Sequence, residues 1–209
     1  MHDPADGLVV FFTGLPGAGK TTLALTLADR LQFLGTRRVR LLDGDVLRAR
    51  LSPDLGFSRM ERDVHMRRIG YVASEIAACG AAAVCAAIAP YDAGRREIRH
   101  LVEPHGRFIL VYVSTPLETC EQRDGKGHYA RARAGELTHF TGISDPYEPP
   151  EDADVTVNTA HLSVDRAIAR VEVVLRSEKL IKESSQPACA DAAHANLSAP
   201  GYFKPASAE

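Results

Sequence analysis

The feature that most constrains this chain is a glycine-rich segment, Gly14–Thr21, which reads G-x-x-x-x-G-K-T. An apolar run at residues 8–12 precedes it, and a segment with leucines at helical spacing, residues 22–34, follows it. Strand, glycine-rich turn and helix in this order are typical of the loop that cradles phosphates with backbone N–H groups. Glycine allows close approach to the phosphate oxygens, and the helix N-terminus adds partial positive charge. The segment therefore predicts binding of a nucleoside triphosphate.

Two side chains at the end of this loop carry chemistry of their own. Lys20 is long enough to reach the β- and γ-phosphates of a bound nucleotide, and the hydroxyl of Thr21 is suited to ligate Mg²⁺. We therefore expect a bound metal ion beside the phosphates.

The composition sets limits on the fold class and on the partners. The chain has 209 residues, 45% of them apolar, which suits one α/β domain with a sizeable core. A net charge of −2 gives no reason to expect a nucleic-acid or membrane partner, and no apolar run approaches the ~20 residues that span a bilayer. The four cysteines are scattered and the N-terminus lacks an apolar signal core, so we expect reduced thiols in a cytoplasmic enzyme.

Strand-like and helical patterns alternate along most of the chain, which predicts an α/β fold. The expected architecture is a three-layer α/β/α sandwich around a mostly parallel five-stranded sheet. Further strands are expected at 39–42, 81–88, 108–113 and 154–157, and helices at 46–51, 59–80, 93–103, 116–123 and 164–175. We expect an N-terminal arm at residues 1–7, the folded domain at 8–182, and a disordered tail or linker at 183–209.

A pair of carboxylates, Asp43 and Asp45, directly follows the second expected strand. Residues just beyond the carboxyl ends of parallel strands line the ligand crevice of such sheets. One carboxylate is then placed to hold Mg²⁺ through water, and the other to accept a proton from an attacking hydroxyl. The alternative is an ordinary turn in which an aspartate caps the helix at 46–51.

The stretch after this helix holds two ambiguous features. Phe57 lies in a loop and fits either a small core contact or a surface on which a base stacks. The following helix begins with a dense run of charge, which is usually only a solvated face. Beside the crevice, however, Arg62 or Arg67 could fork onto a phosphate or a sulfate.

Residues 125–150 break the alternating pattern with a basic and aromatic segment. A long unpatterned segment inside a compact domain is either a surface insertion or a functional loop. Given the phosphate-binding loop, we favour a lid that closes over phosphates and bases and excludes water. These features together predict a small-molecule kinase of the P-loop NTPase type, with a lid over its site.

Six blocks of sequence, in order, resemble the adenylyl-sulfate kinase family over roughly residues 8–176. They are residues 12–22, 42–45, 54–58, 67–70, 132–136 and 140–143. The resemblance implies transfer of the γ-phosphoryl of ATP to the 3′-hydroxyl of adenylyl sulfate, giving 3′-phosphoadenylyl sulfate and ADP, with Mg²⁺. It also implies a homodimer. The stretch 89–92 resembles kinase domains fused to a sulfate adenylyltransferase, which implies partnership or fusion with that enzyme.

The resemblance also implies roles for individual residues. Asp45 is the candidate base, with Lys20 and Asp43 completing the catalytic set, and Thr21 and Asp43 serve the metal. The implied ATP-binding residues are Gly14, Leu15, Pro16, Gly17, Ala18, Gly19, Lys20, Thr21, Thr22 and Arg123. The implied substrate-binding residues are Asp45, Arg48, Phe57, Arg62, His65, Ile88, Lys126 and Phe140, with the two phenylalanines sandwiching the adenine.

The chain departs from the family pattern at positions opposite the loop. Ala89 and Asp92 flank Pro-Tyr where serine and arginine are usual, and His65 replaces a usual asparagine. Two other functions therefore stay open: a kinase for another small nucleotide or alcohol, and a non-catalytic nucleotide-binding regulatory domain of a sulfate adenylyltransferase. The intact Lys20, Thr21, Asp43 and Asp45 argue against the regulatory domain.

Overall fold

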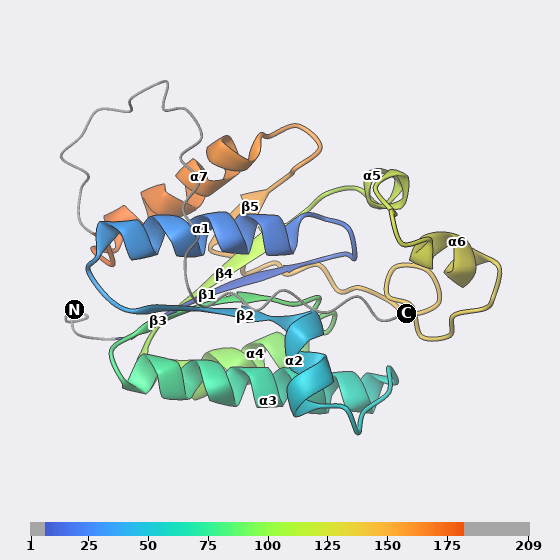
Figure 1. Cartoon of the computed structure of the whole chain (residues 1–209), viewed down its shortest axis with the longest axis horizontal. Helices are drawn as coiled ribbons and strands as arrows, with labels where there is room; N and C mark the ends of the chain where they lie inside the picture. Colours follow the sequence, from blue (N-terminus) through green and yellow to red (C-terminus); the bar gives the residue numbers. More distant parts are fainter. Residues whose placement is uncertain (1–6, 182–209) are drawn as a thin grey trace.

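The computed structural model describes residues 7–181, and Figure 1 shows their arrangement. The expected tail at 183–209, Cys189 and all of the expected arm except Gly7 lie outside the described residues. The strands are β1 (Gly7–Gly14), β2 (Val39–Asp43), β3 (Ala82–Ala86), β4 (Gly106–Val113) and β5 (Val155–Val157). The helices are α1 (Lys20–Leu34), α2 (Gly44–Leu51), α3 (Arg59–Ala78), α4 (Asp92–Val102), α5 (Leu117–Gln122), α6 (His128–Arg133) and α7 (Val164–Ser177).

The five strands form one sheet in the order β2-β3-β1-β4-β5, and every strand pair is parallel. The prediction of a mostly parallel five-stranded sheet is therefore confirmed. β1 is the central strand, paired with β3 on one side and β4 on the other. Asp43 of β2 lies opposite Ala86 of β3, which lies opposite Phe12 of β1. The carboxyl ends of these three neighbouring strands therefore lie together at one edge of the sheet. That edge is where the glycine-rich loop begins.

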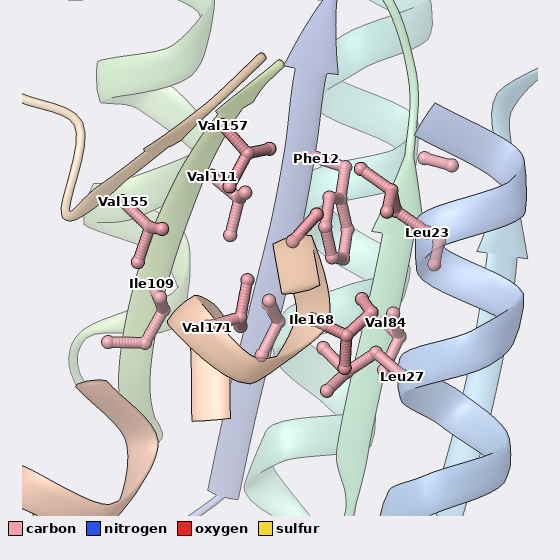
Figure 2. Close-up of a cluster of buried hydrophobic side chains, with 14 of the residues drawn as sticks. Phe12, Leu23, Leu27, Val84, Ile109, Val111, Val155, Val157, Ile168 and Val171 are labelled. Carbon is pink, nitrogen blue, oxygen red and sulfur yellow. The ribbon is translucent and has the colours of Figure 1, made fainter. Parts of the chain in front are cut away.

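Side chains alternate between the two faces of the sheet and build two cores. Leu8, Val10 and Phe12 of β1 belong to the core on the face covered by α1 and α7. Figure 2 shows Phe12 between these two helices. Val9 and Phe11 point to the opposite face, which α3 and α4 cover. Successive side chains of a strand thus pack against helices on opposite faces of the sheet. Each face has its own core, as an α/β/α sandwich requires.

The segment expected to be an unpatterned lid contains a short helix, α6, that the sequence pattern did not predict. Six residues are too few to show a helical period. The helix begins because the carboxylate of Asp124 accepts hydrogen bonds from the backbone N–H groups of His128 and Tyr129, at 3.0 and 2.7 Å. Within residues 7–181, no helix is long and apolar enough to cross a membrane.

The central strand should dominate stability. Phe12 is fully buried in the core of Figure 2, whereas Phe33, at the end of α1, is 88% exposed. We expect Phe12→Ala to lower the free energy of unfolding by about 3–5 kcal/mol, because it leaves a cavity against α1 and α7. Phe33→Ala is the matched control and should change it by less than about 0.5 kcal/mol. Urea denaturation measures both, and similar losses in the two variants would contradict this assignment of the core.

Candidate active site

The glycine-rich loop joins β1 to α1 in a shape that suits phosphate. Gly17 and Gly19 adopt φ angles of 73° and 98°, which favour glycine because other residues are strained there. Gly19 is the N-cap of α1, and no side chain caps this helix end. The first N–H groups of α1 are therefore free of side-chain partners and face the loop, as an anion site at a helix N-terminus requires. The loop fits the triphosphate of ATP.

Lys20 opens α1 and is almost completely buried under the loop. Its Nζ donates a hydrogen bond to the carbonyl oxygen of Leu15 at 2.7 Å. Burial lowers the pKa of Lys20 to about 8, and the nearby carboxylate of Asp45 opposes that effect. The ammonium group is thus held where its charge is poorly solvated, and a phosphate group would offset this cost.

Asp43 serves two structural tasks with its two carboxylate oxygens. Its Oδ1 accepts from the backbone N–H groups of Asp45 and Val46, at 2.9 and 3.2 Å, and thereby caps α2. Its Oδ2 accepts from the hydroxyl of Thr21 at 2.8 Å. The two alternatives for this turn were therefore not exclusive, because the helix cap also contacts the loop. The side chain of Asp45 is exposed at the same place.

The pair formed by Thr21 and Asp43 fits a magnesium ion. A hydroxyl and a carboxylate are oxygen ligands of the kind that Mg²⁺ prefers, and the ion usually completes its shell with water and phosphate oxygens. Among residues 7–181, no group of three or more His, Cys, Asp or Glu side chains is placed to hold a metal by itself. The metal would therefore be shared with the bound nucleotide.

A cavity of about 800 Å³ extends from this loop to the lid. It brings together residues of the glycine-rich loop, the Asp43–Asp45 turn, the segment around Phe57 and the lid. Gly14, Leu15 and Ala18 are the members of the loop set that do not line it. The predicted residues that line it are Pro16, Gly17, Gly19, Lys20, Thr21, Thr22, Asp43, Asp45, Arg48, Phe57, Arg62, His65, Ile88, Arg123, Lys126 and Phe140.

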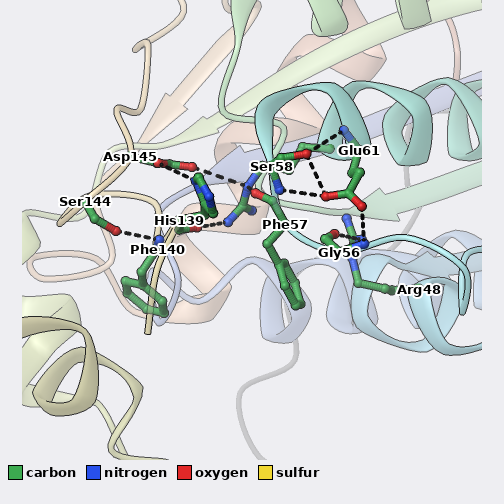
Figure 3. Close-up of polar contacts among 10 residues, drawn as sticks. Arg48, Gly56, Phe57, Ser58, Glu61, His139, Phe140, Ser144 and Asp145 are labelled. Atoms are coloured by element: carbon green, nitrogen blue, oxygen red, sulfur yellow. Dashed lines mark hydrogen bonds and ion pairs between the residues drawn. The ribbon is translucent and has the colours of Figure 1, made fainter. Parts of the chain in front are cut away.

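Phe57 and Phe140 line this cavity from two separate segments, the loop before α3 and the lid. Figure 3 shows both rings extending in the same direction from their backbones. The ring of Phe57 is 53% exposed, so it is not a core residue, and the Arg48 guanidinium lies 4.8 Å from its centroid. An exposed aromatic ring beside a cation, inside a cavity, is suited to stack on a base.

Arg62 joins the two segments that carry these rings. Its side chain is buried, its Nε donates to the carbonyl oxygen of Phe57 at 2.8 Å, and its guanidinium also donates to the carbonyl oxygen of His139. Burial lowers the pKa of Arg62, while the carboxylate of Asp145 opposes that effect. Arg62 therefore braces the cavity wall. Arg67, the other arginine considered for an anion, instead pairs with Glu97 and lies outside the cavity lining.

The loop before α3 is fixed by a capping box. The hydroxyl of Ser58 accepts from the backbone N–H of Glu61, and the carboxylate of Glu61 accepts from the backbone N–H of Ser58 at 3.0 Å (Figure 3). Glu61 also accepts from the backbone N–H of Gly56 at 2.9 Å. The Ser58 hydroxyl also donates to the Glu61 carboxylate at 2.6 Å, and this bond, followed by those from the N–H groups of Gly56 and Ser58, lowers the pKa of Glu61. They hold the residues on both sides of Phe57, so its ring is presented by a rigid turn.

His65 is buried beneath the Asp43–Asp45 turn. Its Nε2 lies 3.2 Å from the carbonyl oxygen of Gly44, and its Nδ1 lies 2.9 Å from the hydroxyl of Ser52. A carbonyl oxygen only accepts, so Nε2 carries the proton and Nδ1 accepts from Ser52. Burial lowers the pKa of His65 to about 4. A role for His65 in binding substrate stays a prediction, because both of its nitrogens are engaged within the protein.

Several cavity residues were not among the sequence-based candidates. Cys120 and Tyr129 line the cavity from α5 and α6, and Asp124 lies between these helices. A single cysteine or tyrosine in an amphipathic or unpatterned segment carries no motif, so only the folded chain reveals its place. Arg123, which was a candidate, donates to the hydroxyl and the carbonyl oxygen of Thr159 at 2.7 and 2.9 Å.

The parallel sheet, the phosphate-binding loop, the Thr21–Asp43 pair and the lid together define a P-loop kinase of small molecules. Residues 6–158 match the family model described as adenylylsulphate kinase. The chain therefore belongs to the adenylyl-sulfate kinase family.

Individual relatives agree with this assignment. An adenylyl-sulfate kinase of Synechococcus sp. (strain JA-3-3Ab) is 52% identical over 171 residues, which cover 82% of this chain and 95% of the relative. The structure of the Mycobacterium tuberculosis APS kinase CysC in complex with AMPPNP and APS has a TM-score of 0.78 and 40% identity. That match covers 82% of this chain and 98% of the other.

Other relatives are much longer proteins. A sulfate adenylyltransferase of Phaeosphaeria nodorum is 44% identical over 184 residues, which are 87% of this chain but only 32% of the relative. The chain thus spans about a third of the length of that enzyme.

The buried His65 makes stability depend on pH. An unfolded histidine titrates near 6.5, whereas the folded pKa is about 4. Between these values the unfolded chain binds a proton that the folded chain does not, so the free energy of unfolding falls as the pH falls. We expect the wild type to lose roughly 2 kcal/mol more between pH 7 and pH 5 than His65→Asn does. Urea denaturation at both pH values measures this, and equal losses in the two proteins would disprove it.

Proposed function

We propose that this chain is an adenylyl-sulfate kinase, which transfers the γ-phosphoryl of ATP to the 3′-hydroxyl of adenylyl sulfate. The products are 3′-phosphoadenylyl sulfate and ADP. One observation carries the proposal: a single cavity joins the phosphate-binding loop to a second site that has two aromatic rings and several cations. Family membership and the relative's structure with AMPPNP and APS support it.

At the ATP end of the cavity, the chain supplies charge and position. The N–H groups of the loop and the ammonium of Lys20 bind the phosphates, and Thr21 and Asp43 hold Mg²⁺. When bound, the metal would neutralise negative charge on the phosphates. Arg123, held by Thr159 at the cavity wall, bounds the side where the base of ATP would lie. Most of the acceleration in phosphoryl transfer comes from such positioning and electrostatics.

At the acceptor end, Phe57 and Phe140 are proposed to sandwich the adenine of adenylyl sulfate. Arg48 and the exposed Lys126 supply positive charge for its phosphosulfate group. Arg62 contributes by bracing the segments of Phe57 and His139, and its positive charge adds to the field in the cavity. Ile88 and His65 close the wall behind the turn that carries Asp45.

Asp45 is the proposed base for the 3′-hydroxyl. Its backbone N–H is bound by Asp43, so its side chain leaves the first turn of α2 in a fixed direction. It is exposed in the cavity on the same turn as the residue proposed to hold the metal. In a loose transition state the hydroxyl proton leaves late, and a carboxylate is basic enough to accept it.

A direct assay separates this function from its alternatives. Purified protein with ATP, Mg²⁺ and adenylyl sulfate should yield ADP and 3′-phosphoadenylyl sulfate. A kinase for another small alcohol or nucleotide would leave adenylyl sulfate unchanged. A regulatory domain would bind both nucleotides without turnover.

The finer features of assembly and location are also proposals. We infer a cytoplasmic, self-associating enzyme, a homodimer in the simplest case, built on a kinase domain at residues 8–182. A solved relative is described as a hexameric APS kinase from Thiobacillus denitrificans, with a TM-score of 0.66 and 40% identity. The sulfate adenylyltransferase relatives support an association with that enzyme. Sedimentation velocity of the purified chain tests the assembly, and a monomer at micromolar concentration would contradict it.

Substitutions of Lys20 and Asp45 should lower turnover without lowering the stability of the fold. We expect Lys20→Met to lower kcat at least about a thousandfold while the melting temperature stays equal or rises, because the change removes a buried charge. Asp45→Asn keeps the shape of an exposed side chain but loses the base. We expect it to lower kcat by about a hundredfold or more without changing stability. Steady-state kinetics and thermal melting measure both, and normal turnover in Asp45→Asn would remove Asp45 as the base.

The aromatic sandwich makes a prediction about the acceptor alone. Phe57→Ala should raise the KM for adenylyl sulfate by about ten- to a hundredfold, since stacking on a base is worth roughly 1–3 kcal/mol. The KM for ATP should stay within twofold, and the exposed ring should cost little stability. Phe33→Ala is the matched control. Equal rises in both KM values would mean that Phe57 does not act on the acceptor.

A further inference from the structure

Tyr129 lies in the lid and contacts both ends of the cavity. Its neighbours in α6, His128 and Ala130, are exposed, but Tyr129 is only 4% exposed. Its hydroxyl donates a hydrogen bond to the carbonyl oxygen of Pro16 at 2.8 Å. Its ring lies edge-on to the ring of Phe140, with centroids 4.9 Å apart and planes at 76°. One side chain thus contacts the phosphate-binding loop and an aromatic ring of the acceptor site.

The backbone under Tyr129 is fixed independently of these contacts. The carboxylate of Asp124 accepts from the N–H groups of His128 and Tyr129, and Gly127 precedes the helix with a φ of 68°. Burial raises the pKa of the Tyr129 hydroxyl strongly, so it stays protonated and remains a donor. Tyr129 therefore has a defined place from which to hold its neighbours.

A second contact joins the lid to the loop on the other side of Phe140. Gly142 has a φ of 93°, and a Cβ added there would lie 2.9 Å from Cδ2 of Leu15. Gly142 lies in a turn that starts at Phe140. The Ser144 hydroxyl closes this turn by accepting from the backbone N–H of Phe140 at 2.8 Å. Leu15 and Pro16 are adjacent in the loop, so the lid meets it at two neighbouring points that flank Phe140.

We propose that Tyr129 is a positioning residue that sets the ring of Phe140 at a fixed place relative to the phosphate-binding loop. The inference rests on the proposed function, in which Phe140 stacks on the acceptor adenine. Reacting atoms must approach within about 3–3.5 Å, so the acceptor base must be held in register with the ATP phosphates. Tyr129 sets this distance, because its hydroxyl bonds the phosphate-binding loop at Pro16 and its ring packs against the ring of Phe140.

A purely structural role for Tyr129 makes a different prediction. Filling the core would depend on the ring, so Tyr129→Phe would leave substrate binding unchanged. If Tyr129 positions Phe140, loss of the hydroxyl frees the ring from Pro16 and weakens binding of the acceptor through Phe140. Two substitutions that act through one contact are not additive.

The test is a double-mutant cycle with Tyr129→Phe, Phe140→Leu and the two combined. Steady-state kinetics give the KM for each substrate, and titration calorimetry gives the Kd for adenylyl sulfate without turnover. We expect Tyr129→Phe to raise the KM and Kd for adenylyl sulfate three- to tenfold, with the melting temperature within 2 °C of wild type. In the Phe140→Leu background the same change should have less than a twofold effect. Tyr71→Phe, an exposed tyrosine on α3, is the matched control and should change nothing.

Each other result contradicts the positioning role. Fully multiplicative effects would show that Tyr129 does not act through Phe140. A change confined to the Kd of an ATP analogue would place its role in the loop alone, and no change at all would leave it a core residue. Failure of the proposed function is distinct, since it would appear in the wild type, as no binding and no phosphorylation of adenylyl sulfate.

Discussion

The structure depends on the hydrogen bonding of β1 to a strand on each side. Because β3 and β4 both pair with it in parallel, β1 lies in the middle of the sheet and is hydrogen-bonded along both edges. The glycine-rich loop starts at that end and passes directly into α1, whose leucines pack on the same face of the sheet. The phosphate-binding loop is therefore anchored to the central strand, while the proposed acceptor site is assembled around it from α2, residues 57–66 and the lid.

Polar contacts hold much of the proposed acceptor side, in addition to the packing of Phe140 against the core and Tyr129. Arg62 ties Phe57 to the lid, Glu61 fixes the turn before α3, and His65 supports the turn of Asp45. Each of these side chains bonds backbone groups of a loop or of a helix start, so segments without regular structure become defined surfaces. This arrangement explains how a long segment outside the sheet still presents its residues to one cavity.

Features that follow from local periodicity could be predicted from the sequence. The strands and the long helices lie where the patterns placed them, because continuous apolar runs mark buried parallel strands and a period of 3.6 marks helices. The loop Gly14–Thr21 was recognised by its glycine and lysine spacing. The short α6 escaped prediction since it starts from the carboxylate of Asp124. The partnership of His65 with Ser52, and of Tyr129 with Pro16, joins residues distant in sequence, and no pattern encodes it.

The double use of Asp43 bears on how substitutions there are interpreted. One oxygen of its carboxylate caps α2 and the other accepts from Thr21, so a single carboxyl group connects the proposed metal site to the helix that carries Arg48. Replacing it would loosen the start of α2 and displace that arginine as well. Damage at one position would then appear in the kinetics of both substrates, even though Asp43 itself lies on the ATP side. An effect of an Asp43 substitution on both substrates would therefore arise from one eight-residue helix.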